Sequence, residues 1–232
     1  MVFFTPSTLT FLRALERNNR REWFRERRDQ YERDVRAPMV ALVERLAGEF
    51  ERFAPDLVAS PQVSIFRIYR DTRFSPDKTP YKTSIAAYFP HARLPKNEGA
   101  GLYVEVAPRH VWIGGGMYMP STTQLQLVRE HLAAHHRRLR RIAASTAFRR
   151  TVGSLEGEQL VRVPRGFPKD HPAADLLRYR QFLAGREEVA AFAHSPAFYR
   201  TLVQTFRAVA PLVSFMNEPL VAARESGALG HD

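Results

Sequence analysis

Apolar residues recur three or four positions apart through the first fifty residues, with charged residues between them. This spacing is typical of amphipathic helices that bury one face. Thr5 and Pro6 form a favourable start for the first helix, and Pro38 restarts the pattern after the second. Three helices are therefore expected. Their inward-facing residues are Leu9, Leu12, Leu15, Trp23, Phe24, Tyr31, Val35, Met39, Leu42, Val43, Leu46 and Phe50.

The middle of the chain is richer in β-branched and aromatic residues, which favour strands. A short turn, Pro108-Arg109-His110, separates two of these segments and predicts an antiparallel hairpin. Residues 90–100 contain two prolines and a glycine and predict a surface loop. The expected strands cover residues 63–70, 84–89, 102–106 and 111–118.

Helical spacing returns in the last hundred residues. Ser121 and Gln124 form a capping box at the start of one helix, and Ser195 caps a long final helix. A strand over residues 160–163 and a short helix over residues 173–179 are expected between the two.

This order of helices, antiparallel strands and helices predicts an α+β fold. The expected architecture is an antiparallel sheet of about four to six strands, packed by N-terminal, central and C-terminal helices. A single domain is expected over residues 1–223, followed by a disordered tail over residues 224–232.

The composition is that of a globular protein, with 44% hydrophobic and 25% charged residues in a chain of 232. The absence of cysteine excludes a disulfide scaffold, a thiolate metal site and a cysteine nucleophile. No apolar stretch reaches the roughly 20 residues of a membrane span, and the N-terminus lacks the pattern of a signal peptide. We therefore expect a cytoplasmic protein.

Basic residues exceed acidic ones, since the chain has 35 Lys and Arg residues and 24 Asp and Glu residues, for a net charge of +11. Such a surface favours anionic partners, which include nucleic acid, anionic small molecules and acidic lipid. The excess does not choose among them. The sequence identifies no cofactor and no oligomeric state.

Ionisable residues concentrate between positions 67 and 82, where five cations, two carboxylates and two phenols occupy sixteen positions. If the preceding strand continues, alternate side chains share a face, and Asp71 would hold Arg67 or Arg73 in a bidentate pair. That pair would orient a guanidinium toward a phosphate or carboxylate. An anion-binding pocket is expected here, floored by the strands at 102–118. The predicted ligand-binding residues are Arg67, Tyr69, Arg70, Arg73, Lys78, Tyr81 and Lys82.

The same charges also fit a structural ion-pair network that holds the fold in an interaction module without chemistry. If the protein is an enzyme, Asp71, Asp77 and Glu105 are the candidates for acid–base catalysis. Pairing with a cation would lower the pKa of Asp77, whereas burial without a partner would raise it. The residues alone leave both interpretations open.

The central segment resembles the signature of a widespread bacterial family of uncharacterised proteins, known as a domain of unknown function. The matching string is Arg67-x-x-Arg70-Asp71-x-Arg73-Phe74-x-x-Asp77-Lys78-x-Pro80-Tyr81-Lys82. Asn18-Asn19 before Trp23-Phe24, the glycine run at 114–116 and residues 164–167 also agree. The resemblance implies a self-contained cytoplasmic bacterial domain and no particular reaction, and it makes residues 67–82 the first place to look for a site.

A second basic window, residues 129–150, contains seven arginines and one glutamate on an expected helix. Such a helix can follow nucleic-acid phosphates or lie on an anionic membrane, and it is also typical of a solvated helix exterior. Nucleic-acid binding through this helix, with Arg137, Arg138 and Arg141 as contacts, is the alternative function.

Two further patterns have ordinary structural explanations. His131 and His135 are four positions apart, which suits two metal ligands, but no third ligand is evident and no metal site is predicted. Gly114, Gly115 and Gly116 end an expected strand, where glycines mark a bulge or allow a ligand to approach the backbone. We favour the bulge.

Overall fold

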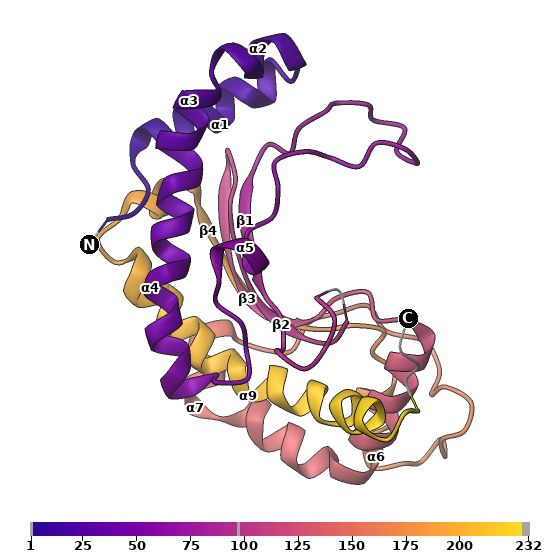
Figure 1. The fold of residues 1–232 in the computed structure, drawn as a ribbon. Coiled ribbons are helices and arrows are strands. Elements are labelled where there is room, and N and C mark those ends of the chain that lie inside the picture. The colour runs from indigo at the N-terminus through magenta and orange to yellow at the C-terminus, as the bar shows by residue number, and fades with distance from the viewer. Residues whose placement is uncertain (1, 97, 229–232) are drawn as a thin grey trace. The chain divides into compact units, whose positions relative to one another are not determined.

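A computed structural model describes residues 2–96 and 98–228 of the chain. Helices and one four-stranded antiparallel sheet, in the order β1-β2-β3-β4, make up the fold (Figure 1). The predicted α+β class is therefore confirmed. The strands are β1 (Ile85–Phe89), β2 (Gly101–Val106), β3 (His110–Met117) and β4 (Phe182–Val189). The helices are α1 (Pro6–Arg17), α2 (Arg21–Glu26), α3 (Arg28–Tyr31), the π-helical η1 (Glu32–Arg36), α4 (Ala37–Phe53), α5 (Pro61–Ser64), α6 (Thr122–Ala144), α7 (Thr146–Val152), α8 (Ala174–Leu177), the 3₁₀ helix η2 (Ala190–His194) and α9 (Phe198–Glu225).

The chain divides into two compact units. Unit 1 comprises Met1–Phe89, Tyr103–Ile113 and Glu187–Val203. Unit 2 comprises Pro90–Leu102, Gly114–Arg186 and Gln204–Asp232.

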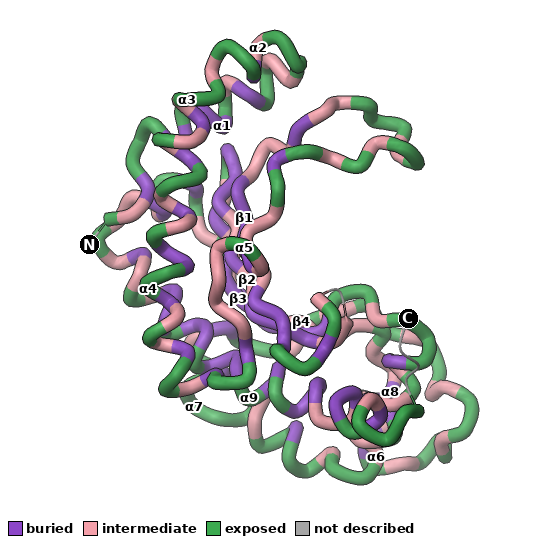
Figure 2. The backbone as a smooth tube through the Cα atoms, in the orientation of Figure 1, coloured by how far each residue is buried: buried purple, intermediate pink, exposed green. Residues whose placement is uncertain are grey.

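The core of unit 1 is built by the amphipathic N-terminal helices. Every predicted inward-facing residue of α1 and α4 is at most 3% exposed, so their pattern is confirmed. Figure 2 shows this buried stripe along α4. Burial of each such side chain contributes about 1.5–3 kcal/mol. The predicted second helix is present as α2, α3 and η1, interrupted at Arg27, where φ is −119°.

An aromatic cluster joins these helices to the segment that follows α5. The rings of Phe11, Phe24 and Tyr31 have centroids 5.3–6.4 Å apart. Phe24 also stacks on Tyr81, with 4.2 Å between centroids and 25° between planes. Such pairs add to the free energy of burial, so the cluster fixes residue 81 against α2.

Residues 63–70 do not form the predicted strand. Pro61 begins the short helix α5, after which the chain touches the sheet through a single antiparallel bridge between Ile65 and Ala87. Tyr69 bridges instead to Tyr81. Residues 67–82 are therefore a hairpin that leaves the sheet between α5 and β1 (Figure 1). The prediction is wrong because Pro80, in the second leg, has no N–H for a regular ladder.

Unit 2 contains the predicted capping box of α6. The Gln124 N–H donates to Ser121 Oγ at 3.2 Å, and the Ser121 N–H donates to Gln124 Oε1 at 2.9 Å. On α9, the buried Asn217 side chain accepts from the Ala100 N–H at 2.7 Å and donates to the Ala100 carbonyl at 2.9 Å. Both polar atoms of this buried amide thus have a hydrogen-bond partner, as burial of a polar group requires.

The predicted strand at 160–163 is wrong, and β4 was not expected. Gln159 forms only an isolated bridge to Tyr179, and residues 160–163 have no strand conformation. β4 pairs with β3, and its residues Phe182 and Ala184 are fully buried. The sequence obscures this strand because the charged run at 186–188 interrupts the apolar alternation that identifies strands.

The end of the chain is more helical than expected, because α9 continues to Glu225. Residues 229–232 of the expected tail lie outside the described residues. In the described part of the chain, no helix combines the length and apolar character that a bilayer crossing requires.

Candidate functional site

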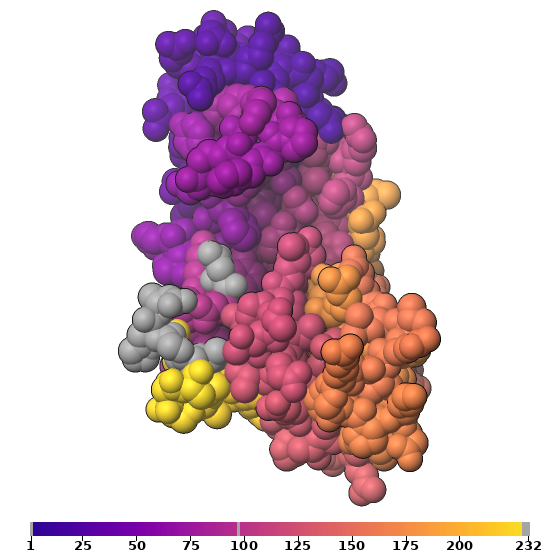
Figure 3. Space-filling model, turned by 90° about the vertical axis from the view of Figure 1, so that its right-hand side faces the viewer, coloured from indigo at the N-terminus to yellow at the C-terminus, as the bar shows by residue number. Residues whose placement is uncertain are grey.

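A basic cleft of about 800 Å³ lies within unit 1, between residues 19–28 and the hairpin 67–82. Figure 3 shows the hairpin side chains, in magenta, directly below the indigo side chains of the N-terminal helices. Six of the thirteen lining residues are cations, and one, Glu22, is a carboxylate. A cleft lined by one sign of charge concentrates ions of the opposite sign. The cations are Arg20, Arg21, Arg25, Arg28, Arg70 and Lys78.

Three of these cations share one side of the helical segment. Arg21 and Arg25 are four positions apart on α2, and Arg28 follows three positions later at the start of α3. Arg21 and Arg25 are therefore neighbours on the surface of α2. Arg28 follows the break at Arg27 and also lines the cleft. Phe24, which is 4% exposed, anchors α2 through its stack on Tyr81. The helix is therefore held with these arginines along the cleft.

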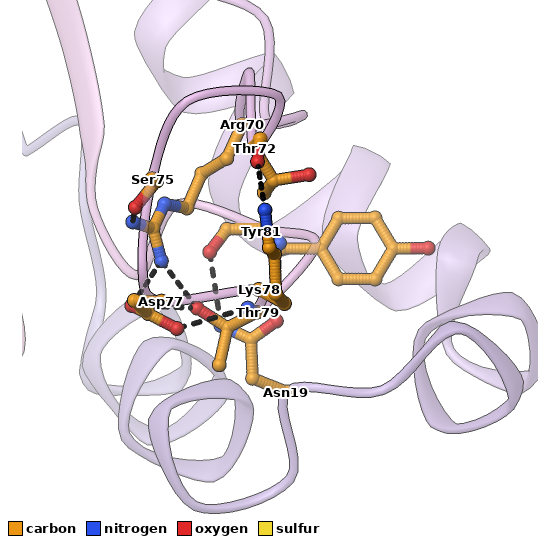
Figure 4. Close-up of polar contacts among 8 residues, drawn as sticks. All are labelled: Asn19, Arg70, Thr72, Ser75, Asp77, Lys78, Thr79 and Tyr81. Atoms are coloured by element: carbon orange, nitrogen blue, oxygen red, sulfur yellow. Dashed lines mark hydrogen bonds and ion pairs between the residues drawn. The ribbon is translucent and has the colours of Figure 1, made fainter.

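The opposite wall is the hairpin 67–82. Its tip, residues 70–79, is held by hydrogen bonds among its own residues (Figure 4). Arg70 Nη1 donates to Asp77 Oδ2 and to Thr79 Oγ1, and Nη2 reaches Ser75 Oγ at 3.4 Å. Asp77 Oδ1 also accepts from the Thr79 N–H at 2.9 Å. Lys78 Nζ donates to the Thr72 carbonyl at 2.9 Å. These bonds fix the shape of the tip through its own side chains.

An asparagine clamp attaches this hairpin to the junction of α1 and α2 (Figure 4). Asn19 Nδ2 donates to the Tyr81 carbonyl at 2.9 Å, and Asn19 Oδ1 accepts from the Tyr81 N–H at 3.1 Å. The side-chain amide thereby makes the pair of bonds that a neighbouring strand would make. Both walls of the cleft are held together by this clamp and by the Phe24–Tyr81 stack.

Hydrogen bonds lower the pKa of both carboxylates in the hairpin. The Thr79 N–H, followed by the Arg70 and Thr79 side chains, lowers the pKa of Asp77 to about 2. The side chain and backbone of Arg73 lower the pKa of Asp71 to about 2. Both are therefore ionised at neutral pH, and a carboxylate with so low a pKa is a weak general base.

The predicted ligand-binding residues divide into two groups. Four of them, Tyr69, Arg70, Lys78 and Tyr81, line the cleft. The other three do not. Arg67 is exposed on the first leg, Arg73 pairs with Asp71 at 2.8 Å, and Lys82 Nζ lies 4.8 Å from the centroid of the Phe66 ring.

The cleft differs from the expected pocket in its lining, which includes neither the strands at 102–118 nor Asp71. The predicted bidentate pair between Asp71 and Arg73 is present, because Arg73 Nε and Nη2 donate to Asp71 Oδ1 and Oδ2 at 3.0 and 2.8 Å. Asp71 and Arg73 are 56% and 77% exposed, so their pair is a solvated contact at the tip. The lining differs because the expected strand is a hairpin that leaves the sheet and packs against the N-terminal helices.

Sequence reasoning missed the arginines of residues 20–28. Their spacing, at positions 21, 25 and 28, was a usable signal, because it places three cations on one helix face beside the Asn18-Asn19 pair. A charged helix face is usually a solvated exterior, so the pattern alone did not distinguish a site.

The catalytic candidates lie outside the cleft. Asp71, Asp77 and Glu105 are not among its lining residues. Glu105 lies on β2, where its Oε2 is 3.8 Å from His110 Nε2. Burial, followed by the charge of Glu105 and a hydrogen bond to it, raises the pKa of Tyr103. Burial also raises the pKa of Tyr81, which keeps its hydroxyl protonated at neutral pH as a donor.

The basic helix α6 is partly neutralised by neighbours in unit 2. Arg138 binds both carboxylate oxygens of Glu218, at 2.7 and 2.6 Å, and Arg140 pairs with Asp175 at 2.7 Å. Arg129 is buried and donates to the Tyr179 carbonyl. The other arginines of the 129–150 window are exposed, namely Arg137, Arg141, Arg149 and Arg150.

The histidines and glycines of unit 2 serve packing. The rings of His131 and His135 lie 4.6 Å apart, and His131 also packs on Phe215. Within residues 2–96 and 98–228, no three His, Asp or Glu side chains form a cluster suited to a metal. Gly116 has φ +131°, and a Cβ there would lie 2.0 Å from the Phe182 carbonyl oxygen. The backbone that lies close to Gly116 is that of β4, so this glycine allows two strands to pack closely and is not explained by a ligand.

Comparison with known proteins identifies one family. Residues 7–215 match the family described as conserved hypothetical protein (DUF2461). The sequence has no match among curated proteins. The match confirms the resemblance to a family of unknown function. Because that description contains no reaction or ligand, function is inferred from the cleft.

Proposed function

We propose that this protein, which belongs to the DUF2461 family of conserved hypothetical proteins, binds a phosphate- or carboxylate-bearing ligand in the basic cleft of unit 1. The observation that supports this most directly is the imbalance of six cations against one carboxylate among the lining residues. Such an imbalance in a concave site favours an anion over a neutral ligand.

The arginines of the helical wall are the main ligand contacts. Among the described residues, no ion pair joins Arg21, Arg25 or Arg28 to a carboxylate, so their charge is available to a ligand. Guanidinium groups bind phosphate and carboxylate through paired N–H donors. Arg70 and Lys78 already have acceptors within the hairpin and mainly contribute positive potential.

Tyr69 and Tyr81 orient the ligand. Both line the cleft, with ring centroids 5.5 Å apart. The hydroxyl of Tyr81 is protonated at neutral pH, as that of any tyrosine with an ordinary or raised pKa, and can donate to an anion. The ionised carboxylates of the hairpin lie outside the cleft, so we assign the site a binding role.

Calorimetric titration with inorganic phosphate, pyrophosphate and a dicarboxylate tests the proposal. Removal of two charges by Arg25→Gln combined with Arg28→Gln is expected to weaken binding at least about tenfold, because hydrogen bonds to charged groups contribute about 1.5–3 kcal/mol. Arg17→Gln is the matched control, since Arg17 is an exposed arginine of α1 outside the cleft.

Two results would contradict the proposal. One is that none of the three anions binds. The other is that the double variant binds as tightly as the unmodified protein, or that Arg17→Gln weakens binding equally.

A further inference from the structure

The hairpin beside the cleft presents two aromatic rings to solvent. Phe74, at the tip, is 93% exposed, and Tyr69, on the first leg, is 54% exposed. Figure 2 shows the tip of this hairpin as mostly exposed. A large ring left in water gains free energy when a partner covers it. Tyr69 lines the cleft whereas Phe74 does not, so a ligand that contacts both rings extends beyond the cleft.

The tip holds its shape without a ligand. Arg70, Asp77 and Thr79 are joined by hydrogen bonds, and Lys78 binds the Thr72 carbonyl across the loop. Because these bonds restrict the backbone around Phe74, little conformational entropy is lost when a partner binds there. Such pre-organisation favours affinity.

A cation lies over the Phe74 ring, and Tyr69 lines the same cleft as six cations. The guanidinium carbon of Arg73 lies 5.8 Å from the centroid of the Phe74 ring, and Arg67 is exposed on the same hairpin. Arg21 and Arg25 lie about one helical turn apart on α2, and Arg28 follows at the start of α3. A row of cations beside exposed rings is the arrangement that binds a nucleic-acid strand, whose phosphates repeat along the backbone and whose bases stack on aromatic faces.

We infer that unit 1 binds single-stranded nucleic acid, with bases stacked on Phe74 and Tyr69 and phosphates held by Arg21, Arg25 and Arg28. This inference rests on the proposed function, because the phosphates occupy the same basic cleft. A single strand is favoured over a duplex because its bases are free to lie on the rings. An anionic membrane fits less well, because a flat surface does not fill a cleft and the tip offers one apolar ring.

Fluorescence anisotropy with a labelled single strand of about fifteen nucleotides tests the inference. Phe74→Leu keeps an apolar side chain but removes the stacking face, and it is expected to weaken binding at least about tenfold. Phe74→Trp restores a larger ring and should retain binding. Neither variant should change pyrophosphate affinity or stability, because Phe74 lies outside the cleft and is exposed. A duplex of the same sequence should bind more weakly than the single strand.

The salt dependence of strand affinity tests whether the phosphates contact the cleft arginines. Arg25→Gln with Arg28→Gln should reduce the slope of log K against log salt by about 0.7 for each phosphate contact removed. Arg137→Gln with Arg141→Gln is the control, since both residues are exposed on α6 in unit 2. This control should leave both slope and affinity unchanged.

The outcomes separate the inference from the proposed function. If pyrophosphate binds but the single strand does not, or if Phe74→Leu binds the strand normally, the inference is overturned and the proposed function stands. Loss of strand binding in the α6 double variant, with the cleft variants unaffected, also overturns it. Binding to anionic vesicles that Phe74→Leu weakens, without strand binding, assigns the tip to a lipid surface and overturns the inference. If neither pyrophosphate nor the strand binds, both proposals fail.

Discussion

The arginines of this chain differ in whether a side chain of the protein already binds their guanidinium group. Arg70 is committed to Asp77 and Thr79, and Arg73 is committed to Asp71. Arg25, by contrast, lies in the cleft wall beside other cations. Because a guanidinium that is already paired offers less to a ligand, the candidate anion contacts are identified by their surroundings.

Asp77→Asn is expected to loosen the tip of the hairpin. An asparagine can still accept from the Thr79 N–H, but its NH₂ group would meet the Arg70 guanidinium, donor against donor. Hydrogen exchange of the Thr79 amide should become faster. Asp71→Asn is the control, because within residues 2–96 and 98–228 Asp71 bonds only to Arg73, and it should leave that exchange unchanged. Equal exchange in both variants would mean that Asp77 does not hold the tip.

The tip should also respond to acid. The pKa of Asp77 is lowered to about 2 in the folded protein, below its value of about 3.9 in an unfolded chain. The carboxylate therefore stabilises the hairpin fully above about pH 4, and that stabilisation is lost as the pH falls toward 2. An NMR titration of the Asp77 carboxyl carbon should show a midpoint near pH 2. A midpoint near 4 would show that the Arg70 and Thr79 bonds are absent in solution.

Substitutions at Tyr81 should separate its ring from its hydroxyl. Tyr81 is 5% exposed and stacks on Phe24, so Tyr81→Ala should lower the free energy of unfolding by about 3–5 kcal/mol. Tyr81→Phe keeps the stack and should stay within about 1 kcal/mol of the unmodified protein, while pyrophosphate binding weakens up to about tenfold. Urea unfolding and calorimetry measure the two effects. A strongly destabilised Tyr81→Phe protein would assign the hydroxyl a structural role.

At the scale of elements, the hairpin 67–82 has features of both a structural ion-pair network and an anion site, the two interpretations that the sequence left open. Its tip is a closed ion-pair and hydrogen-bond network, as the structural interpretation predicts. Its legs carry Tyr69 and Tyr81 into a basic cleft, as the anion-site interpretation requires. The network thus serves as the support for one wall of the cleft.

Asn19→Ala is expected to detach this wall. The change removes both bonds to the Tyr81 backbone and should cost about 1–3 kcal/mol of stability. Exchange of the Tyr81 amide should accelerate. Asn18→Ala is the neighbouring control, because Asn18 bonds to the Ala14 carbonyl within α1 and should leave the Tyr81 amide protected. If both variants expose the Tyr81 amide alike, the clamp is not what holds the hairpin.

Sequence patterns predicted the elements that bury a regular stripe and failed where pairing is irregular. Leu12 and Leu46 lie at helical spacing and are fully buried, so α1 and α4 could be predicted. A strand at 63–70 could not be excluded from the sequence, because the apolar residues of this segment pack against the protein without belonging to a strand of the sheet. The cleft wall at 20–28 was missed because only the fold brings Arg25 to Tyr81, more than fifty positions away.

At the scale of the whole molecule, the cationic side chains have two fates. Some are neutralised by a carboxylate of the same unit, as in the Arg109–Glu16 pair of unit 1 and the Arg138–Glu218 pair of unit 2. Others are gathered in the cleft. The exposed pairs contribute little to stability, about 0–1 kcal/mol each, so the dominant response to salt should come from unpaired cations.

Sulfate should therefore raise the melting temperature more than chloride at equal ionic strength. A divalent anion that binds the folded cleft stabilises it by mass action. Sulfate also stabilises folded proteins generally, because it is excluded from the protein surface, so the contribution of the cleft is the part of the difference that depends on its arginines. A difference of a few degrees is expected, since about 1 kcal/mol shifts the midpoint by about 2–4 °C at this size. Arg25→Gln with Arg28→Gln should shrink the difference measured by calorimetry. An equal difference in that variant would place the anion elsewhere.

The bonds of the Asn19 clamp depend on the number of residues in the hairpin and not on the side chain at position 81. Asn19 bonds to the backbone N–H and carbonyl of residue 81, and every residue type except proline offers both groups. Deletion or insertion of one residue in the tip would shift that peptide by about 3.3 Å and break both bonds. Lineages of this family should therefore conserve the number of residues in the tip, and should vary in sequence mainly at tip positions whose side chains neither bond within the hairpin nor contact a ligand.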